Sequence, residues 1–180
     1  MKARSLAVPL FLALALCQTA GGQVRSLGTW HSRKGAGLTM QVPARHPGES
    51  NTFTVYAELG DIYAGHLETP GGKFVFSHNI SILSFEGVQE GDISLFAGAG
   101  ASAGWVKDYG REGFGMMAAV NGSFGASAAF TANRIHVSAG VTIEAGPWLQ
   151  KTGDNYSVSL YRNGIYRSFY PYISISYLFR

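Results

Sequence analysis

Hydrophobic and polar positions alternate along the second half of the chain with a period of two. Between Phe114 and Phe130 the even positions are apolar or glycine, and the odd positions are mostly small or polar. A period of two places these two sets of side chains on opposite faces of a β-strand. The run is longer than an ordinary soluble strand of roughly 3–10 residues. It is typical of a membrane-barrel strand, apolar toward lipid and small or polar toward the lumen.

The same alternation predicts seven further strands. From Ile135 to Ala145 one face carries only isoleucine, valine and alanine, and the other carries polar residues or glycine. In the third predicted strand Asp61 breaks the alternation, and a β-bulge at Gly60 would restore it. The eight predicted strands cover residues 24–30, 36–42, 51–65, 73–85, 92–106, 114–130, 135–145 and 168–179.

Eight strands predict an all-β fold, an antiparallel up-and-down transmembrane β-barrel with both chain ends in the periplasm. The long loop 149–167 then faces outside. Two alternatives remain open. The pair Asn121-Gly122 is a strong hairpin signal, but a two-residue hairpin would place Val120 and Ser123 on one face, and the alternation assigns them to opposite faces. If residues 157–161 form a strand of their own, the strand count and parity change.

The first 22 residues have the pattern of a secretory signal peptide: a charged start, an apolar core from Leu6 to Leu16 and small residues after it. Residues 1–22 are therefore interpreted as the signal peptide and 23–180 as the outer-membrane barrel domain. Cys17 is the only cysteine. A lipoprotein would be acylated there, but Leu16 suits the lipoprotein peptidase poorly. Cleavage after Gly22 leaves a mature chain without cysteine, and disulfides are then excluded.

Charge and composition exclude several classes of function. The formal charge is +3, and loss of Lys2 and Arg4 with the signal peptide leaves the mature chain near +1. The sequence has no basic run, so we expect no nucleic acid partner. No mature segment has the roughly 20 apolar residues of a transmembrane helix. The five histidines lack ligand spacing and acidic neighbours, so we expect no metal and no other cofactor.

The last residues, from Tyr170 to Arg180, look like the C-terminal signal that the barrel-insertion machinery reads in outer-membrane barrels. Its outward face would carry Ile173, Ile175, Tyr177 and Phe179. Together with the predicted signal peptide, this ending is the basis of a resemblance. The mature chain resembles small eight-stranded outer-membrane proteins of Gram-negative bacteria, of the opacity or adhesion type. The resemblance implies a porin-like barrel at the cell surface, in contact with outer-membrane lipids and lipopolysaccharide.

Three polar residues of inward parity form the most specific chemical pattern. His136, Ser138 and Glu144 share one face of a predicted strand, and a serine, a histidine and an acid together can activate a hydroxyl for acyl transfer. The pair His136-x-Ser138 also looks like the motif of the lipid A 3-O-deacylase barrels. That family's catalytic residues face lipid, whereas these face inward, and its acid lies further downstream. The alternative is a hydrogen-bonded polar interior without catalysis.

Charged residues of inward parity predict a lumen network. Because an eight-stranded barrel is just wide enough to be filled by its own side chains, such charges must pair. The set comprises Glu58, Lys73, Asp92, Arg134 and Glu144. A narrow polar pore is the functional alternative.

Aromatic residues are expected at the membrane interfaces. The candidates are Trp30, Trp105, Trp148, Tyr161, Tyr166, Tyr170 and Tyr177. The function that the whole pattern favours is non-enzymatic. We expect a structural or surface-interaction role through the extracellular loops, chiefly the tyrosine- and arginine-rich segment before the last strand, because loops on a rigid scaffold commonly carry function. Its extracellular ligand cannot be read from the sequence.

Overall fold

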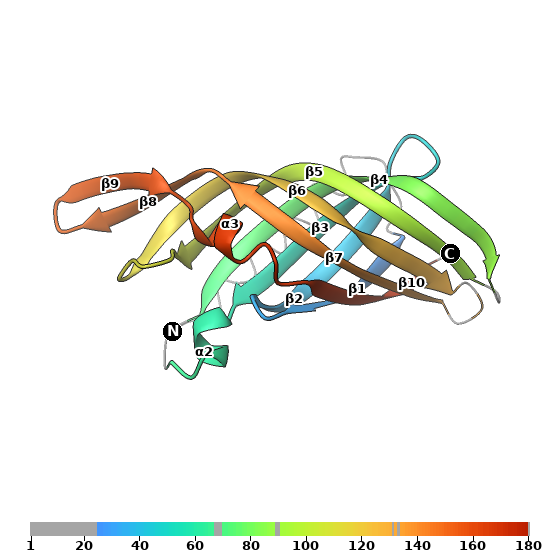
Figure 1. Cartoon of the computed structure of the whole chain (residues 1–180), viewed down its shortest axis with the longest axis horizontal. Coiled ribbons are helices and arrows are strands. Elements are labelled where there is room, and N and C mark those ends of the chain that lie inside the picture. The colour runs from blue at the N-terminus through green and yellow to red at the C-terminus, as the bar shows by residue number, and fades with distance from the viewer. Residues whose placement is uncertain (1–24, 67–69, 89–90, 131, 133, 180) are drawn as a thin grey trace.

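The computed structural model describes residues 25–66, 70–88, 91–130, 132 and 134–179. In this part of the chain ten antiparallel strands form one sheet, shown in Figure 1. The predicted signal peptide and Cys17 lie outside the described residues. The elements are β1 (Ser26–Ser32), β2 (Gly35–Pro43), β3 (Glu49–Glu58), α2 (Gly60–Tyr63), β4 (Gly71–Val88), β5 (Gly91–Lys107), β6 (Phe114–Phe130), β7 (Ile135–Ala145), β8 (Pro147–Thr152), β9 (Asn155–Leu160), α3 (Asn163–Tyr166) and β10 (Tyr172–Leu178).

Eight of these strands close a barrel, in the order β1-β2-β3-β4-β5-β6-β7-β10 and back to β1. Following the paired residues around the wall from Ile135 of β7 leads back to β7 at Ala145, ten residues further along. Such a stagger requires the strands to tilt, by about 40° to the barrel axis for eight strands. The two ends of the barrel differ. The end that carries Arg25 and Phe179 is called here the terminal end, and the opposite end the loop end.

Strands β8 and β9 extend the wall beyond the barrel at the loop end (Figure 1). The chain leaves β7 through Gly146 into β8, and β8 pairs with the first part of β6, with Leu149 opposite Met116. A tight turn at Gly153, whose φ of +62° suits glycine, joins β8 to β9. From residue 161 to residue 171 the chain leaves the sheet, passes through α3 and returns as β10.

The outer face of the barrel is apolar, and the inner face is polar. Buried polar groups include Thr39, Thr54 and Ser102. This is the arrangement of a transmembrane barrel, and an exposed apolar band of this extent is not stable in water. Large exposed apolar side chains on the outer face include Leu27, Leu38, Ile80, Ile93, Trp105, Met116, Val120, Phe124, Val141, Ile143, Ile173 and Ile175. Within the described residues no helix has the length and apolarity to cross a membrane.

The predicted fold class is confirmed, and the observed strand boundaries agree closely with the alternation. Residues 114–130 form one strand, so Asn121-Gly122 is not a hairpin turn. The strand alternative near residue 157 is partly right, because β9 exists, but it forms a hairpin with β8 and leaves the eight-strand closure unchanged.

Two predicted boundaries are wrong. The third strand ends at Glu58, and Gly60 begins the short helix α2 instead of forming a bulge. Asp61 breaks the alternation because it lies beyond the end of the strand. The last strand begins at Tyr172 and not at residue 168, because the preceding segment forms α3 and a turn.

Candidate functional site

A buried ion pair spans the lumen between β4 and β7. The Lys73 Nζ lies 2.7 Å from the Glu144 Oε2, and their side chains are 1% and 2% exposed. Lys73 also donates to the hydroxyl of Tyr161 at 3.0 Å, and its Nζ lies 4.7 Å from the centre of that ring. Buried charges are tolerated only when they are paired and hydrogen-bonded. The contact therefore fixes two walls and the segment after β9 to one another.

Stacked aromatic rings fill the lumen beside this pair. The ring of Trp30 lies 4.4 Å from that of Tyr56 and 5.9 Å from that of Tyr172, centre to centre. Gly37 pairs with Trp30 on one side and with Tyr56 on the other, so no side chain separates the two rings. A Cβ at Gly37 would clash with the Tyr56 side chain and the Val55 carbonyl. The rings and the ion pair together occupy this level of the lumen.

At the loop end, Arg167 joins the final loop to the β3–β4 connection. Its guanidinium lies 3.4 Å from the Glu58 Oε1 and 2.9 Å from the Asp61 Oδ1. Partial burial opposes its charge, but the hydrogen bond to Asp61 and the charge of Glu58 outweigh this and raise the pKa of Arg167. The guanidinium therefore acts as a permanent cation that bridges two loops.

Asp108 joins the β5–β6 turn to α3. Its Oδ1 accepts the backbone N–H groups of Arg162 and Asn163 at 2.8 and 2.9 Å, and Asn163 donates in turn to the Lys107 carbonyl at 2.9 Å. A carboxylate at the first turn of a helix satisfies otherwise unpaired N–H groups. This bracing brings together two exposed rings from different loops, those of Tyr109 and Tyr166, 5.2 Å apart. With the exposed Arg162 they form what we call the loop surface.

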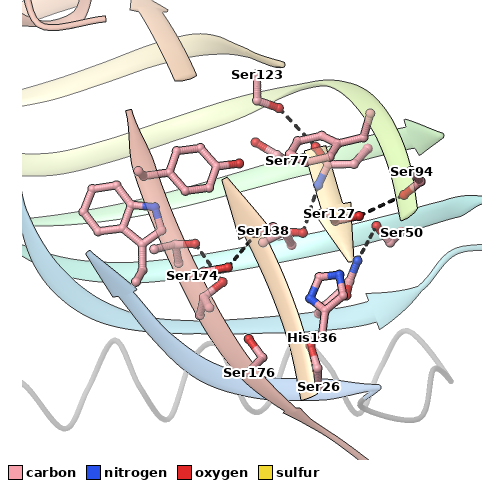
Figure 2. Close-up of a pocket in the computed structure, with 18 of the residues that line it drawn as sticks. Ser26, Ser50, Ser77, Ser94, Ser123, Ser127, His136, Ser138, Ser174 and Ser176 are labelled. Atoms are coloured by element: carbon pink, nitrogen blue, oxygen red, sulfur yellow. Dashed lines mark hydrogen bonds between the residues drawn. The ribbon is translucent and has the colours of Figure 1, made fainter. Parts of the chain in front are cut away.

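A cavity of about 320 Å³ occupies the lumen between the aromatic stack and the terminal end. Its wall is rich in hydroxyl groups, as Figure 2 shows. Many of them bind one another: Ser138 to Ser174 at 2.6 Å, and Ser94 to Ser127 at 2.9 Å. The wall is thus a largely satisfied polar surface, and the volume is at the lower limit of small-ligand sites. The labelled serines are Ser26, Ser50, Ser77, Ser94, Ser123, Ser127, Ser138, Ser174 and Ser176.

The structure does not bring His136, Ser138 and Glu144 together. All three belong to β7, face inward and line the same cavity, at different heights along the strand. The hydroxyl of Ser138 binds Ser174, and Glu144 pairs with Lys73. Eight residues along a strand separate His136 from Glu144 by about 26 Å, which is far beyond hydrogen-bonding reach. No catalytic triad forms from these residues.

The five charged residues expected in the lumen are divided among separate places. Lys73 and Glu144 form the central pair, and Glu58 pairs with Arg167 at the loop end. Asp92 lines the cavity. Arg134 lies in the exposed turn after β6, with a φ of +52°, and donates to the Tyr177 hydroxyl at 2.9 Å.

Three of the aromatic residues expected at the interfaces are instead buried. Trp30, Trp148 and Tyr161 are at most 8% exposed, whereas Trp105, Tyr166 and Tyr177 are exposed. The indole N–H of Trp148 donates to the Val106 carbonyl at 3.1 Å, which explains how a buried tryptophan satisfies its donor.

The sequence also missed the residues that brace the loop end. Asp108, Asn163 and Arg167 lie in connections without periodicity, and their partners are between 54 and 109 positions away. No local pattern predicts such contacts. The outward face expected for the last strand is present, since Ile173, Ile175, Tyr177 and Phe179 are each about half exposed; whether the insertion machinery reads it stays a prediction.

These features define a class of protein: a closed, eight-stranded β-barrel of the transmembrane type, with a polar lumen. In structure the chain is similar to the N-terminal β-barrel domain of Pseudomonas aeruginosa OprF. The TM-score is 0.54 with 12% sequence identity, over 88% of this chain and 99% of that chain. At this identity the likeness establishes the fold alone. No protein-family model matches the sequence, and no curated protein sequence matches it either.

Proposed function

We propose that this chain is an integral outer-membrane β-barrel with a structural or surface-interaction role, carried by its loops. The terminal end would face the periplasm and the loop end the outside. The apolar outer face supports insertion in a bilayer, and the longer connections at the loop end, between β3 and β4 and between β7 and β10, support this orientation. Outer-membrane phospholipid and lipopolysaccharide would surround the barrel. The outward face of β10 would serve as the signal for the insertion machinery.

The observation that carries the proposal is the bracing of the loop end. Asp108 holds α3, and Arg167 holds the β3–β4 connection. Preorganised loops bind with a smaller entropic cost than mobile ones. The exposed rings of Tyr109 and Tyr166, beside Arg162, have the composition of binding hot spots. Acyl transfer has less support, since the triad residues are separated along β7. Conduction has less support too, since the Lys73–Glu144 ion pair and the stacked rings occupy part of the lumen.

The test compares cells that display the parent protein with cells that display the Tyr109→Ser/Tyr166→Ser variant. Retention would be counted on surfaces coated with lipopolysaccharide, mucin or fibronectin. We expect the variant to lose at least tenfold on one of the coats. Tyr63→Ser is the matched control, because Tyr63 is as exposed as these two residues but lies on α2. A heat-dependent gel shift would show that each variant is folded. Equal retention of parent and variant on every coat would exclude the loop surface as the binding site.

A further inference from the structure

Strand β9 has a free edge. One edge of β9 pairs with β8, and no described strand pairs with the other. Unpaired strand edges present a row of backbone donors and acceptors, and proteins usually protect them with charges, proline or bulges. The sequence of β9, Asn155 to Leu160, has none of these. An unprotected edge is therefore a site for pairing with another strand.

The register shows which backbone groups are free. Tyr161 donates its N–H to the Gly146 carbonyl at 2.9 Å, so residues 146 and 161 form a hydrogen-bonded pair. Hydrogen-bonded pairs alternate with non-hydrogen-bonded ones along an antiparallel ladder. The backbone groups of Asn155, Ser157 and Ser159 therefore point toward β8. Those of the intervening residues, Tyr156, Val158 and Leu160, point to the free edge.

The side chains of these same three residues form an exposed apolar row. Tyr156, Val158 and Leu160 are 67%, 68% and 53% exposed. They share one face of β9, since alternate residues of a strand do. The edge thus offers hydrogen bonds and apolar contact at the same positions, a combination that an incoming strand satisfies and that a small ligand does not.

The hairpin rises above the barrel toward the loop end. Val158 lies in one register row with Leu149, Met116 and the exposed Trp105. Because the strands are tilted, residues paired across neighbouring strands lie progressively closer to the loop end from β5 through β6 and β8 to β9. Three strand-to-strand spacings at the barrel tilt place Val158 about 9 Å above Trp105 along the barrel axis. An open strand edge is not tolerated within the hydrocarbon region, which agrees with this placement.

We propose that β9 pairs with β9 of a second copy of this chain. Residues 156–160 read apolar, serine, apolar, serine, apolar, so the pattern is unchanged when it is reversed. An antiparallel pair centred on Val158 therefore sets Val158 opposite Val158 and Tyr156 opposite Leu160. All the free backbone groups named above then meet a partner. The contact is isologous and closes as a twofold dimer.

The twofold axis fixes how the two barrels face. In an antiparallel pair related by symmetry, the axis is perpendicular to the sheet. Because β8 pairs with β6, the hairpin continues the barrel wall, and the axis is perpendicular to the barrel axis as well. The second barrel therefore points the opposite way. This inference rests on the proposed function, in which the loop end lies outside the cell. The second copy would then be embedded in the outer membrane of a facing cell or vesicle.

Disulfide trapping tests the register. In a Cys17→Ser background each introduced cysteine is the only one. Under mild oxidation of the detergent-solubilised protein we expect Val158→Cys to form a covalent dimer. A mixture of Tyr156→Cys and Leu160→Cys should crosslink, but neither variant alone should, because identical sites would lie four residues apart, about 13 Å. Absence of the Val158→Cys dimer, or equal crosslinking by Tyr156→Cys alone, overturns the proposal.

Vesicle clustering tests the geometry without cysteines. Vesicles of phosphatidylethanolamine and phosphatidylglycerol that carry the parent protein should cluster, and Val158→Lys should abolish clustering. Thr152→Lys is the matched control, because it places the same charge on the same hairpin away from the free edge. If Val158→Lys weakens retention on coated surfaces while the parent is monomeric, the edge binds another protein and the second-copy proposal fails. Loss of retention in the Tyr109/Tyr166 variant would still support the proposed function.

Discussion

Lys73 and Glu144, which are 71 positions apart in the sequence, form an ion pair of 2.7 Å inside the barrel. Their strands β4 and β7 are separated in the wall by β5 and β6. The pair therefore forms only when the wall curves enough to bring β4 and β7 face to face across the lumen. Both partners are almost fully buried, and each is the ion-pair partner that most directly offsets the charge of the other.

Removing one partner should cost more than removing both. Lys73→Met leaves the buried carboxylate of Glu144 without its hydrogen-bonded cation, and we expect the free energy of unfolding to fall by about 3–5 kcal/mol. Lys73→Met/Glu144→Leu removes both charges and should lie within about 1 kcal/mol of the parent. Urea unfolding in lipid vesicles, followed by tryptophan fluorescence, measures both. A double variant as unstable as the single one would contradict the compensation.

Asp108 should hold the loop end without contributing to the barrel. In Asp108→Ala the amides of Arg162 and Asn163 lose their acceptor. We expect a local loss of about 1–2 kcal/mol, seen as roughly 5- to 30-fold faster hydrogen exchange around α3. Barrel unfolding should be unchanged. Asp154→Ala, in the exposed turn of the β8–β9 hairpin, is the control. Unchanged exchange at residues 162–163 would show that the carboxylate does not brace the loop.

The barrel could be predicted from sequence because its cause is local. Apolar and polar side chains must alternate in each strand that faces lipid. The alternation in residues 114–130 and 135–145 therefore predicts both the strand and the face of each side chain. The turn at Asn121-Gly122 was correctly rejected by parity. The error at Gly60 has the same origin: alternation was extended past Glu58, where the chain no longer lies in the wall and its side chains no longer need to alternate.

The contacts inside the barrel were less predictable, because parity gives the face and not the partner. Lys73 and Glu144 were both assigned to the lumen, but Arg134, in the same assigned set, lies in an exposed turn. The partner of a lumen charge depends on the stagger between neighbouring strands, summed around the barrel. That stagger is a property of the whole ring of strands and not of one segment. The bracing by Asp108 and Arg167 depends on loops that have no periodicity at all.

Gly37 should be required for the stack of Trp30 and Tyr56. A valine there would meet the Tyr56 side chain and the Val55 carbonyl, and we expect Gly37→Val to lower the free energy of unfolding by roughly 1–3 kcal/mol through overpacking. Near-ultraviolet circular dichroism should show loss of the ring pair. Gly72→Val is the matched control, because a Cβ at that position meets nothing within 4 Å. Equal destabilisation by the two substitutions would argue against the role of Gly37.

Val120 and Val158 have the same exposed fraction, 68%, but should respond in opposite ways to charge. Val120 lies on the outer face of β6 within the apolar band, so Val120→Arg should cost about 2–4 kcal/mol, the value for an arginine near the bilayer midplane. Val158 lies on the hairpin that we place beyond the lipid, and Val158→Arg should therefore change the free energy of unfolding by less than about 0.5 kcal/mol. Urea unfolding in vesicles compares them. An equal loss of unfolding free energy in the two variants would show that both residues contact lipid, and the hairpin would then lie within the bilayer.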